Sequence, residues 1–118
     1  MGFLHKHGLL IASVVLALIV AGAGVAKLMG VPMVHASFAK LGLPVWFGYF
    51  VGAAEIAGAI GLFIRPLAVW AAGGLAIIGL GAVYYHVTHP PLSEGIAAMV
   101  VLALAVFLTV KRGGARQA

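Results

Sequence analysis

Residues 44–64 read PVWFGYFVGAAEIAGAIGLFI, and this stretch decides what kind of protein the chain is. Its 21 consecutive residues contain a single charged side chain, Glu55. A helix needs about 20 mainly apolar residues to cross a hydrocarbon core of about 30 Å. Only helices and closed barrels can cross lipid, and the stretch lacks the alternation of a barrel strand. It therefore predicts a transmembrane helix.

Three further apolar stretches accompany it, at residues 8–29, 66–87 and 93–110. The last of them is slightly short for a full crossing. Together the four stretches predict an all-α membrane protein, a four-helix transmembrane bundle that forms one domain over residues 1–118. The basic start and the small residues near Ala21 are also features of a signal peptide, but the apolar run is longer than a signal peptide needs, so we expect a retained span.

Short polar or proline-containing segments separate the stretches. Ser93 and Glu94 have the pattern of a helix cap followed by an acid in the first turn of the last span. Residues 33–41, MVHASFAKL, are too few to cross a membrane. Val34, Phe38 and Leu41 fall on one helical face, which predicts a short amphipathic helix at the membrane interface.

The composition excludes most soluble classes. Of 118 residues, 64% are hydrophobic and only 8% are charged, and the mean hydropathy is +1.22. Average soluble domains have about 25% charged residues. An ordinary soluble enzyme, a disordered protein and a nucleic-acid binder are therefore excluded, and the lipid bilayer is the expected environment. The absence of cysteine excludes disulfides, iron–sulfur clusters and cysteine–zinc sites.

The net charge of +5 is distributed unevenly among the connectors and tails. An even number of spans places both termini on one side, together with most of the basic residues: Lys6, Arg65, Lys111, Arg112 and Arg116. Lys40 falls on the other side, with Lys27 near a span end. The positive-inside rule therefore predicts cytoplasmic termini, and we expect the plasma membrane of a bacterium.

Glu55 is the strongest candidate for a functional residue, because a carboxylate in the middle of a span faces the bundle interior and has a partner or a task. Gly48, Gly52, Glu55 and Ala59 share one helical face, and small residues there allow close helix approach or leave room for a ligand. Two interpretations stay open: a functional carboxylate flanked by ligand-contacting Gly48 and Gly52, and a glutamate that only hydrogen-bonds another helix or stays protonated.

Lys27 is the expected partner of Glu55. It sits near the end of the first span, in the same half of the membrane as the start of the second. It can form an ion pair with Glu55, or its side chain can extend to the lipid headgroups.

His86 is the third candidate, because a histidine at a span end can relay protons. Tyr84 and Tyr85 precede it and are candidate ligand contacts, although an interfacial aromatic belt also explains them. His35 and His89 are expected on the same side of the membrane. The spacing of these histidines is not typical of a metal or haem site, and we predict no metal.

Three segments resemble the DoxX and DoxX-like family of small four-span membrane proteins. They are residues 21–28, AGAGVAKL, then residues 38–44, FAKLGLP, followed by GAAEIAGA at 52–59, and finally His86. The resemblance covers roughly residues 10–110. It implies a relation to the subunit of a thiosulfate:quinone oxidoreductase for which the family is named, and to partners or assembly factors of redox enzymes. By this resemblance Lys27, Glu55 and His86 match family positions.

Three functions fit these observations. The first is a membrane subunit or partner of a quinone-linked redox system, with Lys27, Glu55, Tyr85 and His86 around the quinone headgroup. The second is a non-enzymatic protein that binds lipid or a partner helix, homo-oligomers included, and stabilises a membrane complex. The third is a small proton-coupled carrier, which at this length would have to oligomerise. Whether the protein is an enzyme stays open.

Overall fold

The computed structural model describes residues 2–89 and 95–117, and these ranges are helical apart from short turns. The predicted all-α class is confirmed. Along the sequence, the four long helices correspond to the four apolar stretches. Ser93 and Glu94, predicted to cap the last helix, lie outside the described residues. In chain order the elements are α1 (Gly2–Leu28), α2 (Pro32–Lys40), α3 (Val45–Gly61), the 3-10 turn η1 (Arg65–Leu67), α4 (Ala68–Thr88) and α5 (Ile96–Gln117).

The helices differ in length, and this decides which of them can cross a membrane. Within the described ranges, three segments are long and apolar enough for a membrane span by length and composition: His7–Leu28, Arg65–Thr88 and Ile96–Gly113. The 17 residues of α3 form a shorter apolar helix. At 1.5 Å per residue α3 is about 26 Å long, a little less than the hydrocarbon core of about 30 Å.

The end of α3 is earlier than predicted, because the chain tightens after Gly61. The amides of Phe63 and Ile64 bond to carbonyls three residues back, and Ile64 is extended. Pro66 comes two residues later, and because it has no backbone N–H, a continued α3 would lack the hydrogen bond at that position. The predicted range 44–64 therefore divides into a helix and a turn that leads into η1.

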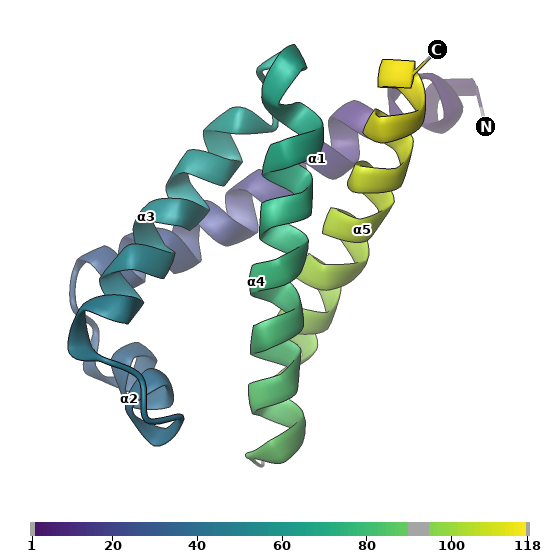
Figure 1. The fold of residues 1–118 in the computed structure, drawn as a ribbon. Helices are drawn as coiled ribbons and strands as arrows, with labels where there is room; N and C mark the ends of the chain where they lie inside the picture. The colour runs from purple at the N-terminus through teal and green to yellow at the C-terminus, as the bar shows by residue number, and fades with distance from the viewer. Residues whose placement is uncertain (1, 90–94, 118) are drawn as a thin grey trace.

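The helices pack as two pairs (Figure 1). The antiparallel helices α4 and α5 lie side by side, while the second half of α1 runs along α3. Earlier in its course α1 also contacts α5, which joins the two pairs. Both chain termini lie at one end of the molecule, and α2 folds beside the start of α3 toward the other end.

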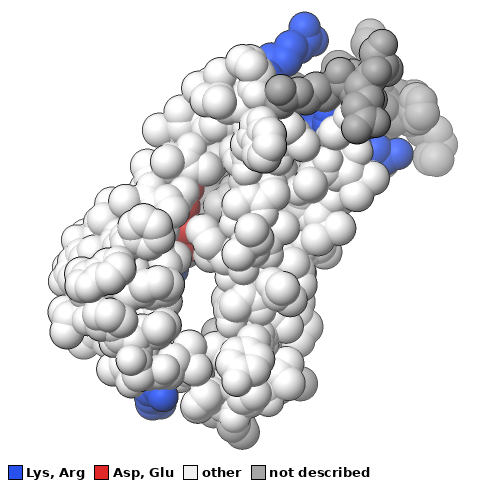
Figure 2. Space-filling model, in the orientation of Figure 1, with Lys and Arg blue, Asp and Glu red and all other residues white. Residues whose placement is uncertain are grey.

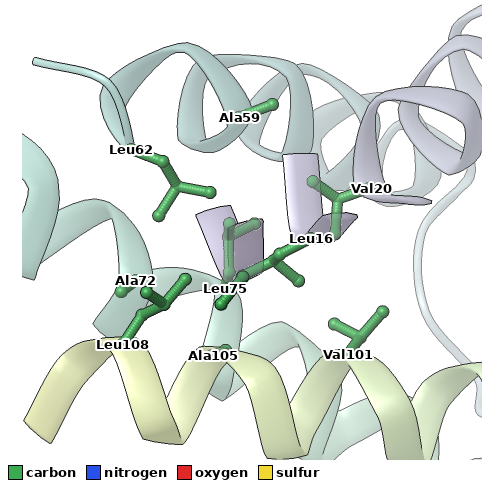
Figure 3. Close-up of a cluster of buried hydrophobic side chains, with 10 residues drawn as sticks. Leu16, Val20, Ala59, Leu62, Ala72, Leu75, Val101, Ala105 and Leu108 are labelled. Carbon is green, nitrogen blue, oxygen red and sulfur yellow. The ribbon is translucent and has the colours of Figure 1, made fainter. Parts of the chain in front are cut away.

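The core lies where these helices meet (Figure 3). Ala12, Leu16 and Val20 of α1 recur at a spacing of four residues and are all buried. Because every four residues is slightly more than one helical turn, they form a stripe on one face of α1. Alanines on the partner helices keep the helix axes close together. The buried cluster comprises Ala12, Leu16, Val20, Ala59, Leu62, Ala72, Leu75, Val101, Ala105 and Leu108.

Two glycines direct the chain between α1 and α3. Gly30 and Gly42 each have φ of 75°, the left-handed conformation that glycine adopts without steric cost. After α1, the amide of Gly30 bonds to the Lys27 carbonyl and the amide of Val31 bonds to the Ala26 carbonyl. This is the Schellman arrangement that satisfies the last carbonyls of a helix. It reverses the chain, so α2 returns over the end of α1.

Candidate functional site

The contact between α1 and α3 depends on two glycines that face each other. A Cβ atom at Gly24 would lie 2.8 Å from the backbone oxygen of Gly52, and one at Gly52 would lie 2.7 Å from the Cβ of Lys27. Any larger residue would force the helices apart. Lys27 and Glu55 each follow one of these glycines by three residues, about one helical turn. The close crossing therefore brings the two charged side chains together.

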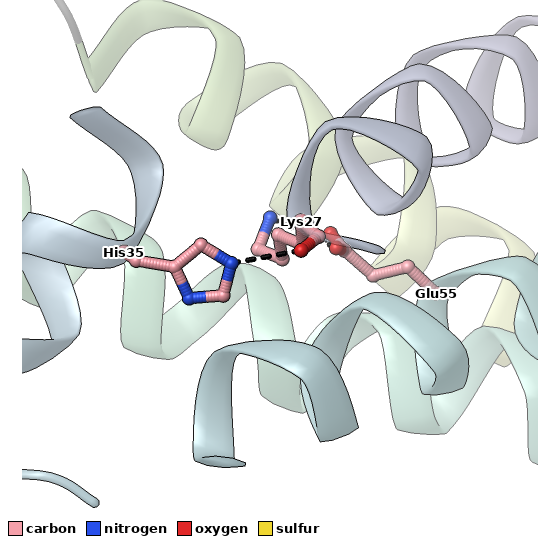
Figure 4. A network of polar contacts seen from close by, with 3 residues as sticks. All are labelled: Lys27, His35 and Glu55. Atoms are coloured by element: carbon pink, nitrogen blue, oxygen red, sulfur yellow. Dashed lines mark hydrogen bonds and ion pairs between the residues drawn. The ribbon is translucent and has the colours of Figure 1, made fainter. Parts of the chain in front are cut away.

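Lys27 and Glu55 form an ion pair inside the bundle (Figure 4). The Nζ atom of Lys27 lies 2.9 Å from Oε1 of Glu55, and the two side chains are 13% and 6% exposed, respectively. Of the two arrangements considered for Lys27, the structure has the ion pair and not an extension to the headgroups. Glu55 lies on the buried face of α3, together with Gly48, Gly52 and Ala59.

The pair retains capacity for further hydrogen bonds. Oε1 of Glu55 is buried and accepts no well-directed hydrogen bond, so its contact with Lys27 is electrostatic. A lysine ammonium carries three N–H donors. Within residues 2–89 and 95–117, Glu55 is the only partner of the Lys27 ammonium. The pair can thus offer both a donor and an acceptor to a small polar group.

His35 completes the polar group, from α2. Its Nε2 atom lies 2.8 Å from the backbone oxygen of Lys27. Since a carbonyl oxygen only accepts, Nε2 is the protonated nitrogen and donates. The ring also packs against Gly48 and lies 4.5 Å, centroid to centroid, from the ring of Tyr49. His35 therefore holds α2 to the end of α1 and to the first turn of α3.

The sequence suggested only the side of the membrane on which His35 lies, not this contact. Its role depends on the chain reversal at Gly30, which brings residue 35 back to residue 27. The one available signal was Gly48: a glycine on the inward face of α3 leaves space for a neighbouring ring.

A pocket of about 400 Å³ opens beside His35, between α2 and the start of α3. Its wall is apolar except for the imidazole of His35 and the hydroxyl of Tyr49. Pockets of about 300–1,000 Å³ with a few polar groups are typical of small-molecule sites. The lining residues are Gly30, Pro32, His35, Ala36, Phe38, Ala39, Leu43, Pro44, Val45 and Tyr49.

The contacts of His86 are with residues outside this polar group. It is near the end of α4, where its Cβ packs against Gly95 and its ring meets the edge of Tyr85. No hydrogen bond or ion pair links His86 to Lys27 or Glu55 in the described part of the chain. The structure therefore brings together two of the three predicted catalytic residues.

The four residues predicted to contact a ligand lie on two different helices. Tyr85 stacks on His89 at 4.4 Å, and Tyr84 is exposed on the outside of α4. Gly48 and Gly52 contact His35 and Lys27 through close packing. No cluster of three metal-ligating side chains occurs among the residues that the structure describes.

The sequence matches a known family over most of its length. The DoxX-like family matches residues 11–108, which is most of the chain. The chain belongs to the DoxX-like family. The matched range of this DoxX-like protein includes Lys27, His35 and Glu55. No match was found among curated proteins or among solved structures.

The family and the apolar helices together identify this DoxX-like protein as an integral membrane protein. Within that setting, a buried ion pair is uncommon, because ionisable residues in spans are rare and mark functional or strongly paired positions. The Lys27–Glu55 pair is therefore the centre of the candidate site.

Proposed function

We propose that this DoxX-like protein is a membrane subunit or partner of a quinone-linked redox system, and that the Lys27–Glu55 pair contacts the quinone headgroup. The observation that carries the proposal is the ion pair itself: a donor and an acceptor, 2.9 Å apart, held inside an apolar bundle with hydrogen-bonding capacity to spare. Membrane-soluble ligands with a polar ring need such a group at the end of an apolar path.

The residues present fit the polar ends of a quinone. A quinone carbonyl accepts a hydrogen bond, which the Lys27 ammonium can donate. The hydroxyl of the reduced form donates one, which Oε1 of Glu55 can accept. When bound, a quinone supplies the electron-carrying chemistry, while the protein supplies binding and orientation.

The location of the pair supports access from the membrane. Figure 2 shows a hollow between the α2–α3 part of the molecule and the lower half of α4, with acidic surface drawn red on its wall. Glu55 is the acidic residue of the described ranges, and 5% of it is exposed. A small part of Glu55 thus reaches the surface while most of the pair stays enclosed.

Glu55, Lys27 and His35 each have a distinct role in this proposal. Glu55 holds or releases a proton at its carboxylate, which a carboxyl group beside a titrating ligand can do. Lys27 keeps the carboxylate in place and donates to the ligand. His35 is a positioning residue, because it contacts the backbone oxygen of Lys27 and not the ion pair.

The test is mass spectrometry of small molecules that copurify with the protein in native lipid discs. We expect the wild type to retain a quinone and Glu55→Gln to lose it, because the amide keeps the shape of the side chain but not its charge. The matched control is His86→Gln, since no hydrogen bond or ion pair links His86 to the pair in the described part of the chain.

A quinone retained equally by wild type and Glu55→Gln would contradict the proposal, and so would a wild type that retains none. Thermal unfolding of both variants separates lost binding from lost folding. Breaking a buried ion pair costs about 3–5 kcal/mol, so the discs are compared at a temperature where Glu55→Gln is still folded.

A second function, binding of a partner helix without enzymatic activity, is supported by a different observation. Gly74 and Gly81 lie two turns apart on exposed parts of α4, and neither has an atom within 4 Å of where a Cβ would be. Exposed small residues let another helix approach closely. Under this proposal, Gly74→Leu together with Gly81→Leu removes a copurifying protein or a homo-oligomer and leaves bound small molecules unchanged.

A further inference from the structure

A second pocket, lined in part by arginines, lies at the end of the bundle that carries the chain termini. Its volume is about 200 Å³. Four parts of the chain meet around it: α1, the turn after α3, the start of α4, and the last turns of α5. The lining residues are Leu10, Leu62, Phe63, Arg65, Ala68 and Arg112.

Both charged residues in this pocket are arginines. Their guanidinium groups carry the same charge and repel each other. None of the six lining residues is acidic. Of the two acids in the chain, Glu55 is paired with Lys27, and Glu94 lies outside the described residues. Two cations in a small pocket whose described lining holds no acidic residue favour an anionic ligand.

Arg112 provides an independent indication. Its Nε atom is buried, and no acceptor for that N–H is found in the described part of the chain. Buried polar groups in proteins are nearly always hydrogen-bonded, so an unpaired donor next to a cavity indicates a missing acceptor. Arginine donates through a planar fork of N–H groups, and this geometry matches two oxygens of one phosphate.

The walls of the pocket favour a lipid over a soluble anion. Leu10 and Phe63 are 53% and 52% exposed, so an apolar surface continues outward from the two arginines. Trp70, in the first turn of α4, is also exposed, and tryptophan is enriched at the depth of lipid headgroups. In Figure 2 the blue basic surfaces gather mainly at this end of the molecule.

From these observations we infer that Arg65 and Arg112 form a binding site for the headgroup phosphate of an anionic membrane lipid. The phosphate lies between the guanidinium groups, and an acyl chain follows the apolar surface of Leu10 and Phe63. Ala68 places the start of α4 at the pocket, where the positive end of the helix dipole adds to the attraction. This site is separate from the Lys27–Glu55 pair and does not depend on the function proposed for that pair.

The last carbonyls of α3 are the competing partners for these arginines, because Leu62 and Phe63 follow directly after that helix. If the arginines only cap α3, their loss lowers stability without changing the binding of any lipid. A binding measurement therefore distinguishes the two roles.

The test is native mass spectrometry of the full chain, purified in neutral detergent and supplied with phosphatidylglycerol or with phosphatidylcholine. We expect one tightly held phosphatidylglycerol, with phosphatidylcholine bound more weakly. Replacing both residues, as Arg65→Gln with Arg112→Gln, should weaken phosphatidylglycerol binding by at least about tenfold. Arg65→Lys with Arg112→Lys keeps the charge but loses the fork, and an intermediate affinity is expected.

The matched control is Lys111→Gln, because Lys111 is exposed next to Arg112 and does not line the pocket. Equal loss of lipid in Lys111→Gln and in the arginine variants would overturn the proposal in favour of general surface charge. Displacement of the lipid by millimolar inorganic phosphate would overturn the lipid as the ligand.

Where the double glutamine variant does not fold, Arg65→Gln and Arg112→Gln are measured singly. Each is expected to weaken phosphatidylglycerol binding more than Lys111→Gln does. Single variants that melt at lower temperature but bind the lipid as wild type does would assign the arginines to capping α3 and overturn the site.

Discussion

Gly52 sets the distance between α1 and α3, and through it the distance between Lys27 and Glu55. There is no room for a side chain at this position, because the nearest neighbours of a Cβ include the backbone oxygen of Gly24 at 3.0 Å. A backbone atom cannot rotate away as the end of a flexible side chain can. The ion pair is therefore a consequence of the glycine crossing as much as of its own charges.

We predict that Gly52→Ala destabilises the protein by about 1–3 kcal/mol, as overpacking of a close-packed contact does. The measurement is thermal unfolding in detergent, followed by circular dichroism. The same substitution also moves the two helices apart, so Glu55→Gln should cost less in a Gly52→Ala background than in the wild type.

Gly74→Ala is the matched control for this prediction. It is the same substitution in a helix, at a position with open space around the new methyl group. Alanine favours the helix over glycine by about 1 kcal/mol, so Gly74→Ala should be neutral or stabilising. Equal melting temperatures for Gly52→Ala and Gly74→Ala would show that the crossing tolerates a wider separation.

The sequence predicts Lys27 and Glu55 because charge within an apolar run is conspicuous and energetically costly. It could not decide whether they touch, since that depends on the stagger of two helices. His35 has no such signal: it sits in the short amphipathic segment 33–41, where a histidine needs no special explanation. His86 is the opposite case: the sequence predicts it as a site residue, but its contacts are with Tyr85 and Gly95.

At the scale of the elements, α2 is the least strongly anchored helix. It has nine residues, and an isolated helix of that length is unstable in water. Its attachments are the Schellman turns at Gly30 and Gly42, the hydrogen bond from His35 to Lys27, and packing on α3. Since it also forms one wall of the 400 Å³ pocket, its attachment determines the shape of that pocket.

We predict that His35→Ala releases α2 without unfolding the bundle. Hydrogen exchange over residues 32–40 should become about five- to tenfold faster, as expected for the loss of one hydrogen bond and its packing, while exchange in α4 and α5 stays unchanged. His89→Ala is the control, because within residues 2–89 and 95–117 the side chain of His89 bonds to its own helix end, at Tyr85 and Thr88. Unchanged exchange in His35→Ala would mean that packing on α3 alone holds α2.

The sequence predicted the helical elements well because a long apolar run has few alternatives in lipid. The ends were less accurate, for physical reasons. Leu62, Phe63 and Ile64 are apolar, so hydropathy predicts that they belong to the span. The backbone, however, already turns there ahead of Pro66. In the opposite direction, α1 and α5 continue beyond their apolar residues, since nothing at Lys6 or Lys111 breaks a helix.

At the scale of the whole molecule, the charges divide along the long direction of the bundle. Arg65, Lys111 and Arg112 lie at the end with the chain termini, and Lys40 ends α2 on the other side. An excess of basic residues marks the cytoplasmic side of a membrane protein. This arrangement predicts cytoplasmic termini only if α3, the shortest of the four long helices, crosses the membrane.

Single cysteines test that condition directly, because the natural chain contains none. Ala39 in α2 and Leu67 in η1 are both exposed and lie on opposite sides of α3 in the chain. We predict that a membrane-impermeant maleimide labels Ala39→Cys in intact bacterial cells and labels Leu67→Cys only after lysis. The reverse pattern would invert the topology. Labelling of both from the same side would mean that α3, at about 26 Å, enters the membrane without crossing it, and the Lys27–Glu55 pair would then lie nearer to one surface.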